Sequence, residues 1–365
     1  MFLFLLASLA LLALYLSRIE VRDIFSPELR KLVLLAFTHL REKRYAEAVQ
    51  TYSVLLELKP DYPEGYVNRG NAYFALGEVE KAIADYSKAI DLRPDFAEAY
   101  NNRGNAYLSQ GKVEDALRDF SKACELNPRL AEAFFNRAMV FSETGKVKEA
   151  LEDLSRCVLL NPSDAEALYH RALLVLRYQG CDEGVAQDVS RALMLRPMDP
   201  KLYLLRGVYF FQKGEHERAL EDFSKVIDLR RKSVWAYYLR GIVFLELGRY
   251  EEAMEDFTAA LTIDPALFRA YFARGLCFYR KGEYERALED FSAAILLRSD
   301  FLRGYVFRVL TYKALGKHEE AEKDRAYLEE RGFPWRGFLE TEEKAVGGYL
   351  GEEVGVLEFL ESALP

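Results

Sequence analysis

The sequence predicts an all-α protein in which about nine helical hairpins stack side by side as a solenoid. A small residue returns at a 34-residue step, and each copy has two stretches whose apolar residues are spaced three and four apart, the period of an amphipathic helix. One hairpin cannot bury its apolar face alone, so neighbouring copies must stack. The small residues are Ala36, Gly70, Gly104, Ala138, Ala172, Gly207, Gly241 and Gly275, and the ninth copy has Val309 in their place.

The first helix of each copy is predicted around this small residue. In the second copy Tyr66, Gly70, Tyr73 and Phe74 share one helical face. A small side chain lets two helices approach closely, and the aromatic rings fill the remaining space. The small residue therefore marks where the first helix meets the second.

The second helix follows a glycine turn and stops at a proline in several copies. In the second copy Gly77 marks the turn, and Ala82, Tyr86, Ala89 and Ile90 lie at helical spacing after it. Proline ends a helix because it lacks the amide hydrogen and clashes with the preceding turn. The closing prolines are Pro60, Pro94, Pro128, Pro162, Pro197 and Pro265.

This pattern resembles the tetratricopeptide repeat family over roughly Pro27 to Gly332, because many positions recur in phase. The resemblance implies a right-handed α-solenoid in which the first helix of each copy lines a concave groove. Two departures are consistent: the usual tryptophan site holds another side chain, mostly Tyr, and arginine replaces the usual leucine before the small residue. The predicted copies are residues 27–60, 61–94, 95–128, 129–162, 163–197, 198–231, 232–265, 266–299 and 300–332.

Residues 1–17 are predicted to form a hydrophobic anchor helix, with residues 18–26 as a linker. Residues 1–16 carry no charged side chain and would span about 24 Å at ~1.5 Å per residue, against ~30 Å for the hydrocarbon core of a bilayer. Arg18 and Arg22 follow this segment, so the positive-inside rule places the repeats in the cytoplasm of a single-pass membrane protein. Cleavage as a signal peptide, with export to the periplasm, is the alternative.

Composition indicates a folded chain, since 50% of the residues are hydrophobic and 13% are aromatic. The net charge of -8 and the lack of a basic stripe with interleaved aromatic residues argue against a nucleic-acid partner. Cys124, Cys157 and Cys277 occupy positions that are small or apolar in other copies, as buried thiols do. Cys181 lies in a lengthened turn, where we expect more exposure.

Arginine and aspartate recur together, and we interpret them as a structural ion-pair ladder. Eight copies have Arg before the small residue and Asp at one place on the second helix, whereas the first copy has Leu35 and Thr51 there. This shared membership predicts that each Arg pairs with the Asp of its own copy and fixes the register of the hairpin. The pairs are Arg69–Asp85, Arg103–Asp119, Arg137–Asp153, Arg171–Asp188, Arg206–Asp222, Arg240–Asp256, Arg274–Asp290 and Arg308–Asp324.

The groove implied by the resemblance has two unlike ends. One end carries asparagines one repeat apart, which can hydrogen-bond the main chain of an extended peptide because an amide both donates and accepts. The other end is apolar and suits large side chains or one face of a partner helix. The predicted groove residues are Asn68, Asn71, Asn101, Asn102, Asn105, Asn136, Tyr169, Leu205, Phe211, Tyr238, Phe272 and Tyr279. The alternative is that these amides are solvated or cap local structure and that the apolar side chains pack against one another.

Residues 333–365 follow the repeats as an acidic tail with scattered apolar side chains. Val354, Val356, Leu357, Phe359 and Leu360 are spaced for a short amphipathic helix. One interpretation is a cap on the ninth copy, because end repeats need a cover. The other places the tail in the apolar end of the groove, in the place of a partner.

The function predicted is a non-enzymatic protein–protein interaction scaffold that binds a peptide or a partner helix in the groove at a membrane. The alternative is a self-assembling structural component of a membrane-associated complex. An enzyme is disfavoured, since the sequence has no Walker-type phosphate loop, no HExxH, no nucleophile elbow and only four histidines. His170, which the resemblance points toward the groove, is interpreted as a polar groove residue. We expect no cofactor and no metal.

Overall fold

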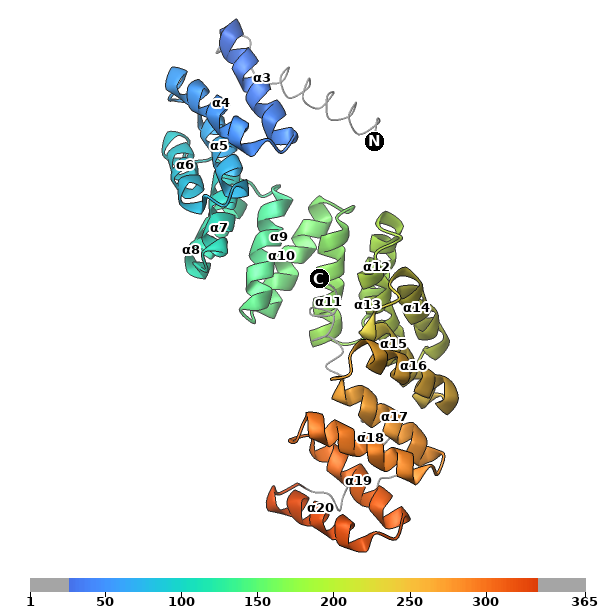
Figure 1. Cartoon of the computed structure of the whole chain (residues 1–365). Coiled ribbons are helices and arrows are strands. Elements are labelled where there is room, and N and C mark those ends of the chain that lie inside the picture. The colour runs from blue at the N-terminus through green and yellow to red at the C-terminus, as the bar shows by residue number, and fades with distance from the viewer. Residues whose placement is uncertain (1–25, 334–365) are drawn as a thin grey trace. The chain divides into compact units, whose positions relative to one another are not determined.

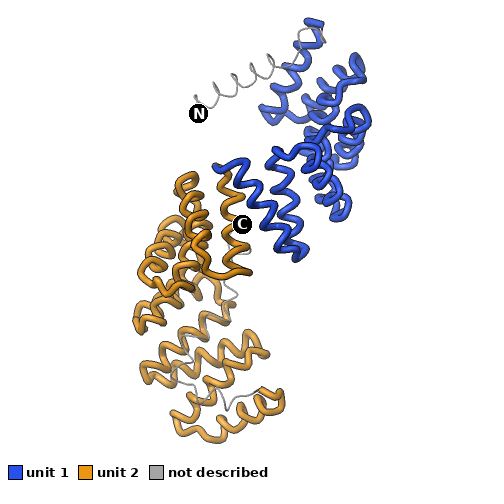
Figure 2. The backbone as a smooth tube through the Cα atoms, turned by 180° about the vertical axis from the view of Figure 1, so that it is seen from behind, with its two compact units in different colours: residues 1–162 blue, residues 163–365 orange. Residues whose placement is uncertain are grey.

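The computed structural model describes residues 26–333, and this part of the chain consists of α-helices joined by short turns (Figure 1). Two compact units divide it after Pro162 (Figure 2). The predicted anchor and most of the predicted tail lie outside the described residues. Among residues 26–333, no helix combines the length and apolar character needed to cross a bilayer.

Unit 1 contains four helical hairpins. Within it each helix packs against its neighbour in the sequence, so that every hairpin stacks on the next. Its helices are α3 (Pro27–Arg41), α4 (Tyr45–Leu58), α5 (Pro63–Ala75), α6 (Val79–Leu92), α7 (Ala97–Ser109), α8 (Val113–Leu126), α9 (Ala131–Glu143) and α10 (Val147–Leu160).

Unit 2 contains five hairpins built in the same way. Its helices are α11 (Ala165–Tyr178), α12 (Glu183–Leu195), α13 (Pro200–Gln212), α14 (His216–Leu229), α15 (Val234–Glu246), α16 (Tyr250–Ile263), α17 (Phe268–Arg280), α18 (Tyr284–Leu297), α19 (Leu302–Ala314) and α20 (His318–Glu330). The odd-numbered helix of each pair is the first helix of a copy, so the predicted α-solenoid fold is confirmed, with nine hairpins among residues 26–333.

The turn inside each hairpin needs a left-handed residue. Gly77 has φ +78°, and the equivalent glycines of the following copies also have positive φ, a conformation that glycine adopts without steric cost. The first copy has no turn glycine, and Lys43 takes this role with φ +59°. The turn is therefore set by the hairpin geometry, and the first copy accepts backbone strain to form it.

The small residue of the first helix faces a large side chain of the second. A Cβ atom at Gly70 would lie 2.6 Å from the ring of Tyr86, and one at Gly241 would lie 2.7 Å from the ring of Phe257. The fourth copy has Ala138 as its small residue and Leu154 in place of the ring, and both side chains are fully buried. The two positions together fill a fixed volume at the centre of the hairpin.

Candidate functional site

The Arg–Asp ladder is present in all eight copies for which the sequence predicts it. In each pair Arg Nε and Nη2 donate to the two carboxylate oxygens of the Asp in the same copy, at 2.6–2.9 Å. This two-point geometry fixes the guanidinium plane against the carboxylate. The aspartates are buried on the second helix, so the ladder holds the two helices of each hairpin in register.

A third contact of the same arginines joins neighbouring copies. In six copies Arg Nη1 donates to a hydroxyl of the preceding copy, at 3.0–3.4 Å. The acceptors are Ser53, Ser87, Ser121, Ser224, Thr258 and Ser292. The ladder therefore links hairpins within each unit as well as the helices of one hairpin.

These hydroxyls are not among the contacts predicted above, although the sequence carries a signal for them. A Ser or Thr lies two residues after the ladder position in copies one to eight, and the ninth copy has Ala326 there. The hydroxyl of one copy accepts from the arginine of the next copy. The ninth copy is the last one among the described residues, and the first copy has no arginine at this position. The set of hydroxyls is thus displaced by one copy from the set of arginines.

Burial and pairing have opposite effects on the charges of this ladder. Burial raises the pKa of Asp222, Asp256 and Asp290 above the ordinary aspartate value, and the hydrogen bonds from their arginines oppose that rise. The bond to Asp256 raises the pKa of the Arg240 guanidinium further. An arginine stays protonated in proteins, so the pair remains an ion pair that depends on both partners.

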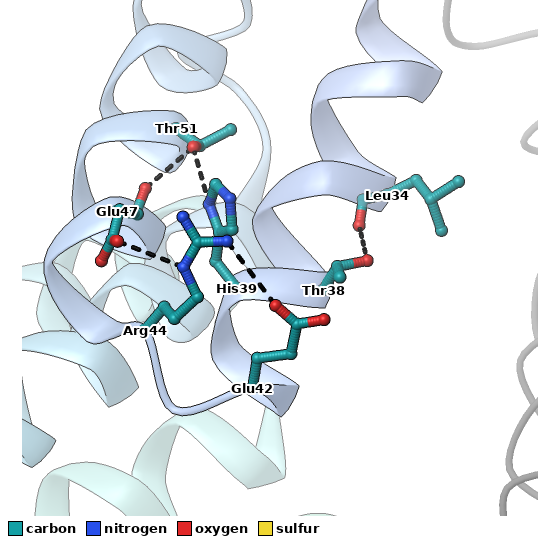
Figure 3. Close-up of polar contacts among 7 residues, drawn as sticks. All are labelled: Leu34, Thr38, His39, Glu42, Arg44, Glu47 and Thr51. Atoms are coloured by element: carbon teal, nitrogen blue, oxygen red, sulfur yellow. Dashed lines mark hydrogen bonds and ion pairs between the residues drawn. The ribbon is translucent and has the colours of Figure 1, made fainter.

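The first copy replaces the ion pair with a single hydrogen bond between Thr51 and His39 (Figure 3). Thr51 takes the place of the aspartate, and its Oγ1 lies 3.2 Å from Nδ1 of His39. The Thr51 hydroxyl donates its single hydrogen to the Glu47 carbonyl oxygen at 2.8 Å, so Nδ1 of His39 is the donor in the other bond. A polar link between the two helices is thereby kept without an arginine–carboxylate pair.

The predicted amide end of the groove lies in unit 1 and forms a chain of side-chain hydrogen bonds. Asn136 Nδ2 donates to Asn101 at 2.9 Å, Asn101 Nδ2 to Asn102 at 3.3 Å, and Asn102 Nδ2 to Asn71 at 2.9 Å. The Tyr86 hydroxyl also donates to Asn71, at 2.8 Å. Asn101 is 1% exposed, so much of the hydrogen-bonding capacity of these amides joins α5, α7 and α9. Asn68 and Asn105, the remaining predicted amides, are half-buried.

The predicted apolar end lies in unit 2, and most of its residues belong to the core. Tyr169, Leu205, Tyr238 and Phe272 are 7%, 0%, 2% and 7% exposed. These four side chains are buried in the folded chain, and their role as contact residues stays a prediction. The two other predicted residues, Phe211 and Tyr279, are half-buried.

Models of one repeat family match most of the residues that the structure describes. Models described as TPR repeat or tetratricopeptide repeat match residues 39–77, 70–111, 97–130, 131–164, 204–268 and 238–300. The chain belongs to the tetratricopeptide repeat family. No curated protein sequence matches this TPR protein.

Solved structures similar to this TPR protein include other repeat proteins. A tetratricopeptide repeat protein from Parabacteroides merdae ATCC 43184 is 23% identical, with 68% of this chain and 98% of that chain covered and a TM-score of 0.48. The APC/C hetero-tetramer Cut9–Hcn1 gives 18% identity, 77% and 55% coverage and a TM-score of 0.49. YrrB, described as a TPR protein with an unusual peptide-binding site, gives 21% identity, 70% and 97% coverage and a TM-score of 0.32.

Groups that could do chemistry are scattered over this TPR protein. Residues 26–333 hold no group of three or more His, Cys, Asp or Glu side chains that could bind a metal ion. Cys124, Cys157 and Cys277 are buried, and Cys181 is half-buried with its Sγ 3.2 Å from Gln212 Oε1. Burial raises the pKa of Cys277 to about 12, which keeps this thiol protonated and unreactive at neutral pH. His170 lies 3.6 Å from Glu166, within one helix.

Proposed function

We propose that this TPR protein is a non-enzymatic scaffold that binds a protein partner along the first-helix face, meaning the face of the odd-numbered helices turned away from the second helices. One observation carries the proposal. The ladder uses the same side chains in eight copies to hold the hairpins, whereas the first-helix face changes from amide in unit 1 to apolar in unit 2. In a repeat protein, binding specificity depends on the surface residues that differ between copies, whereas the repeated residues hold the copies together.

The amide end suits an extended peptide. Asn68 and Asn105 are half-buried on α5 and α7, and each side chain can donate and accept a hydrogen bond. The neighbouring amides are held in place by the hydrogen-bond chain from Asn136 to Asn71. A peptide binding here would meet amides that are already oriented, which lowers the entropic cost of association.

Attachment to a membrane is a second part of the proposal. Residues 1–16 are apolar and uncharged, and basic residues follow them. A single-pass anchor there would hold the repeats at the cytoplasmic face. Extraction with alkaline carbonate tests this: the anchored protein stays with the membranes, and release of the intact chain into the supernatant contradicts the anchor.

Photo-crosslinking in native membranes tests the binding face. A photoreactive residue at Asn105 should attach a partner protein, whereas one at exposed Glu114 on α8 serves as the matched control on the second-helix side. A partner captured from Glu114 and not from Asn105 would move the binding surface to the second helices. Capture of a second copy of this chain would instead indicate the self-assembling structural role.

A further inference from the structure

The residue that follows the small residue of each copy differs sharply in burial between the two units. In unit 1 Phe37 is 38% exposed, and Asn71, Asn105 and Met139 are half-buried. In unit 2 the same position forms what we call the apolar column, with exposures of 3%, 0%, 0%, 2% and 9% for Leu173, Val208, Ile242, Leu276 and Leu310. The Arg–Asp contacts agree to within 0.2 Å between the units, at 2.7 and 2.9 Å in one pair and 2.8 and 2.7 Å in another, so the ladder does not distinguish the units in the way that this position does.

Cations border the apolar column on the last two first helices. On α17, Arg269 lies seven residues before Leu276 and Arg280 four residues after it. On α19, Arg303 lies seven residues before Leu310 and Lys313 three residues after it. These spacings put the cations on the helical face that carries the column. All four side chains are half-buried or exposed, so basic groups border the buried apolar column at both of its edges.

The faces of α17 and α19 are contiguous. The ring of Phe307 on α19 lies 5.4 Å from the ring of Phe272 and 6.4 Å from that of Tyr279, both on α17. At one edge a cavity of about 410 Å³ is lined by Arg269, Arg303 and Phe333, together with the Arg298–Asp300 ion pair and apolar side chains. Phe333 is the last described residue, so the chain leaves α20 beside this face.

We propose that the C-terminal segment, residues 334–365, docks on this first-helix face of unit 2 and covers the apolar column. The segment contains seven Glu against one Arg and one Lys, and its apolar residues include Val356, Leu357 and Phe359. This composition complements a face that is apolar in the middle and basic at its edges. The inference rests on the proposed use of first-helix faces for binding, and it names the partner class of unit 2 as acidic segments with apolar side chains.

The segment is long enough for this contact. Its 32 residues would reach about 48 Å as a helix at ~1.5 Å per residue, and helices pack about 8–10 Å apart, so several first helices lie within its range. Because it is joined to α20, its effective concentration at the face is high, and an outside partner must displace it. Partner binding at unit 2 is therefore coupled to release of the segment.

Photo-crosslinking of the purified full-length protein tests this docking. A photoreactive residue at Tyr279, and independently at Phe211, should crosslink to a peptide from residues 334–365 of the same chain. A matched residue at Leu296 on α18, which is 87% exposed, should not. Mixing chains with and without isotope label separates contacts within one chain from contacts between two.

Charge reversal sharpens the test. Replacing Arg280→Glu together with Lys313→Glu should lower the Tyr279 crosslink yield roughly fivefold, whereas Arg286→Glu on α18 should leave it unchanged. Crosslinks to the segment from Tyr327 on α20 alone, to the segment of a second chain, or to nothing would each overturn the docking. The purified protein holds no partner, so this result is independent of whether Asn105 captures a partner in membranes.

Discussion

The two units use the same internal supports and differ in the surface that they support. In both, a buried aspartate holds an arginine by two hydrogen bonds, and a small residue faces a large side chain. The first helices of unit 1 are joined by amides, whereas those of unit 2 bury an apolar column. The repeated supports therefore set stability, and the differing faces carry the binding specificity that we propose.

Removing one partner of an Arg–Asp pair should cause the largest loss of stability, in both units. Asp222→Ala in unit 2 leaves Arg206 without its buried carboxylate, and we expect a loss of about 3–5 kcal/mol in the free energy of unfolding. Asp119→Ala in unit 1 should cost about the same, because its contacts with Arg103 have matching lengths. Urea denaturation followed by circular dichroism measures both.

The control for this pair is Glu217→Ala on α14, an exposed carboxylate in the same helix as Asp222. Its effect should stay within about 0.5 kcal/mol. Comparable losses for Glu217→Ala and Asp222→Ala would remove the ladder from the account of stability. A loss confined to one unit would show that the two units do not share their support.

The small-residue contact gives the next largest effect. Glycine to alanine in a helix normally stabilises it, but the added Cβ of Gly241→Ala would lie 2.7 Å from the Phe257 ring. We expect a net loss of about 1–3 kcal/mol in the free energy of unfolding from overpacking. The double variant with Phe257→Leu copies the Ala138 and Leu154 combination of unit 1 and should recover most of the loss. Additive losses would contradict a shared volume.

Much of the repeat arrangement could be predicted from the sequence, because it depends on residues that recur in phase. The small positions and the glycine turns gave the hairpins, and the shared membership of Arg and Asp gave the ladder pairs. Recurrence does not report exposure, so the sequence predicts Leu205 and Tyr238 as groove residues without indicating that they are buried. The turn at Lys43 also had no signal, because nothing in the first copy marks a left-handed residue.

The hydroxyl contacts and the amide chain could not be predicted from the sequence, for a different reason. Each joins residues of two copies, and a comparison aligned copy by copy does not display partners displaced by one repeat. Ser224, for example, accepts from Arg240 of the following copy. The sequence predicts the amides as groove residues, but their hydrogen bonds to one another depend on the stacking distance between first helices, which recurrence in the sequence does not report.

Breaking the amide chain probes the face that only unit 1 has. Asn101→Ala removes the acceptor of Asn136 and a donor to Asn102 at a buried position. We expect a loss of about 1 kcal/mol, since half-buried Asn136 can take a water molecule in exchange. Asn105→Ala, at a half-buried position on the same helix, is the matched control and should change stability by less than about 0.5 kcal/mol. Equal losses would show that the chain of amides does not join the copies.

The smallest expected effect is a dependence on pH at the start of unit 2. Contacts with His170 and Arg196 lower the pKa of Glu166 to about 2, and Arg196 Nη1 donates to its carboxylate at 2.6 Å. A carboxyl whose pKa is depressed in the folded chain stabilises the fold at pH values above its pKa in the unfolded chain, near 4.5. It loses that contribution as the pH falls toward 2.

The Glu166 side chain is 43% exposed, so solvent screening limits the contribution to below about 1 kcal/mol. The free-energy difference between the native protein and Glu166→Gln, measured by urea denaturation, should therefore shrink between pH 5 and pH 2. A difference that stays constant or grows over this range would mean that the Arg196 contact does not hold the carboxylate in its charged form.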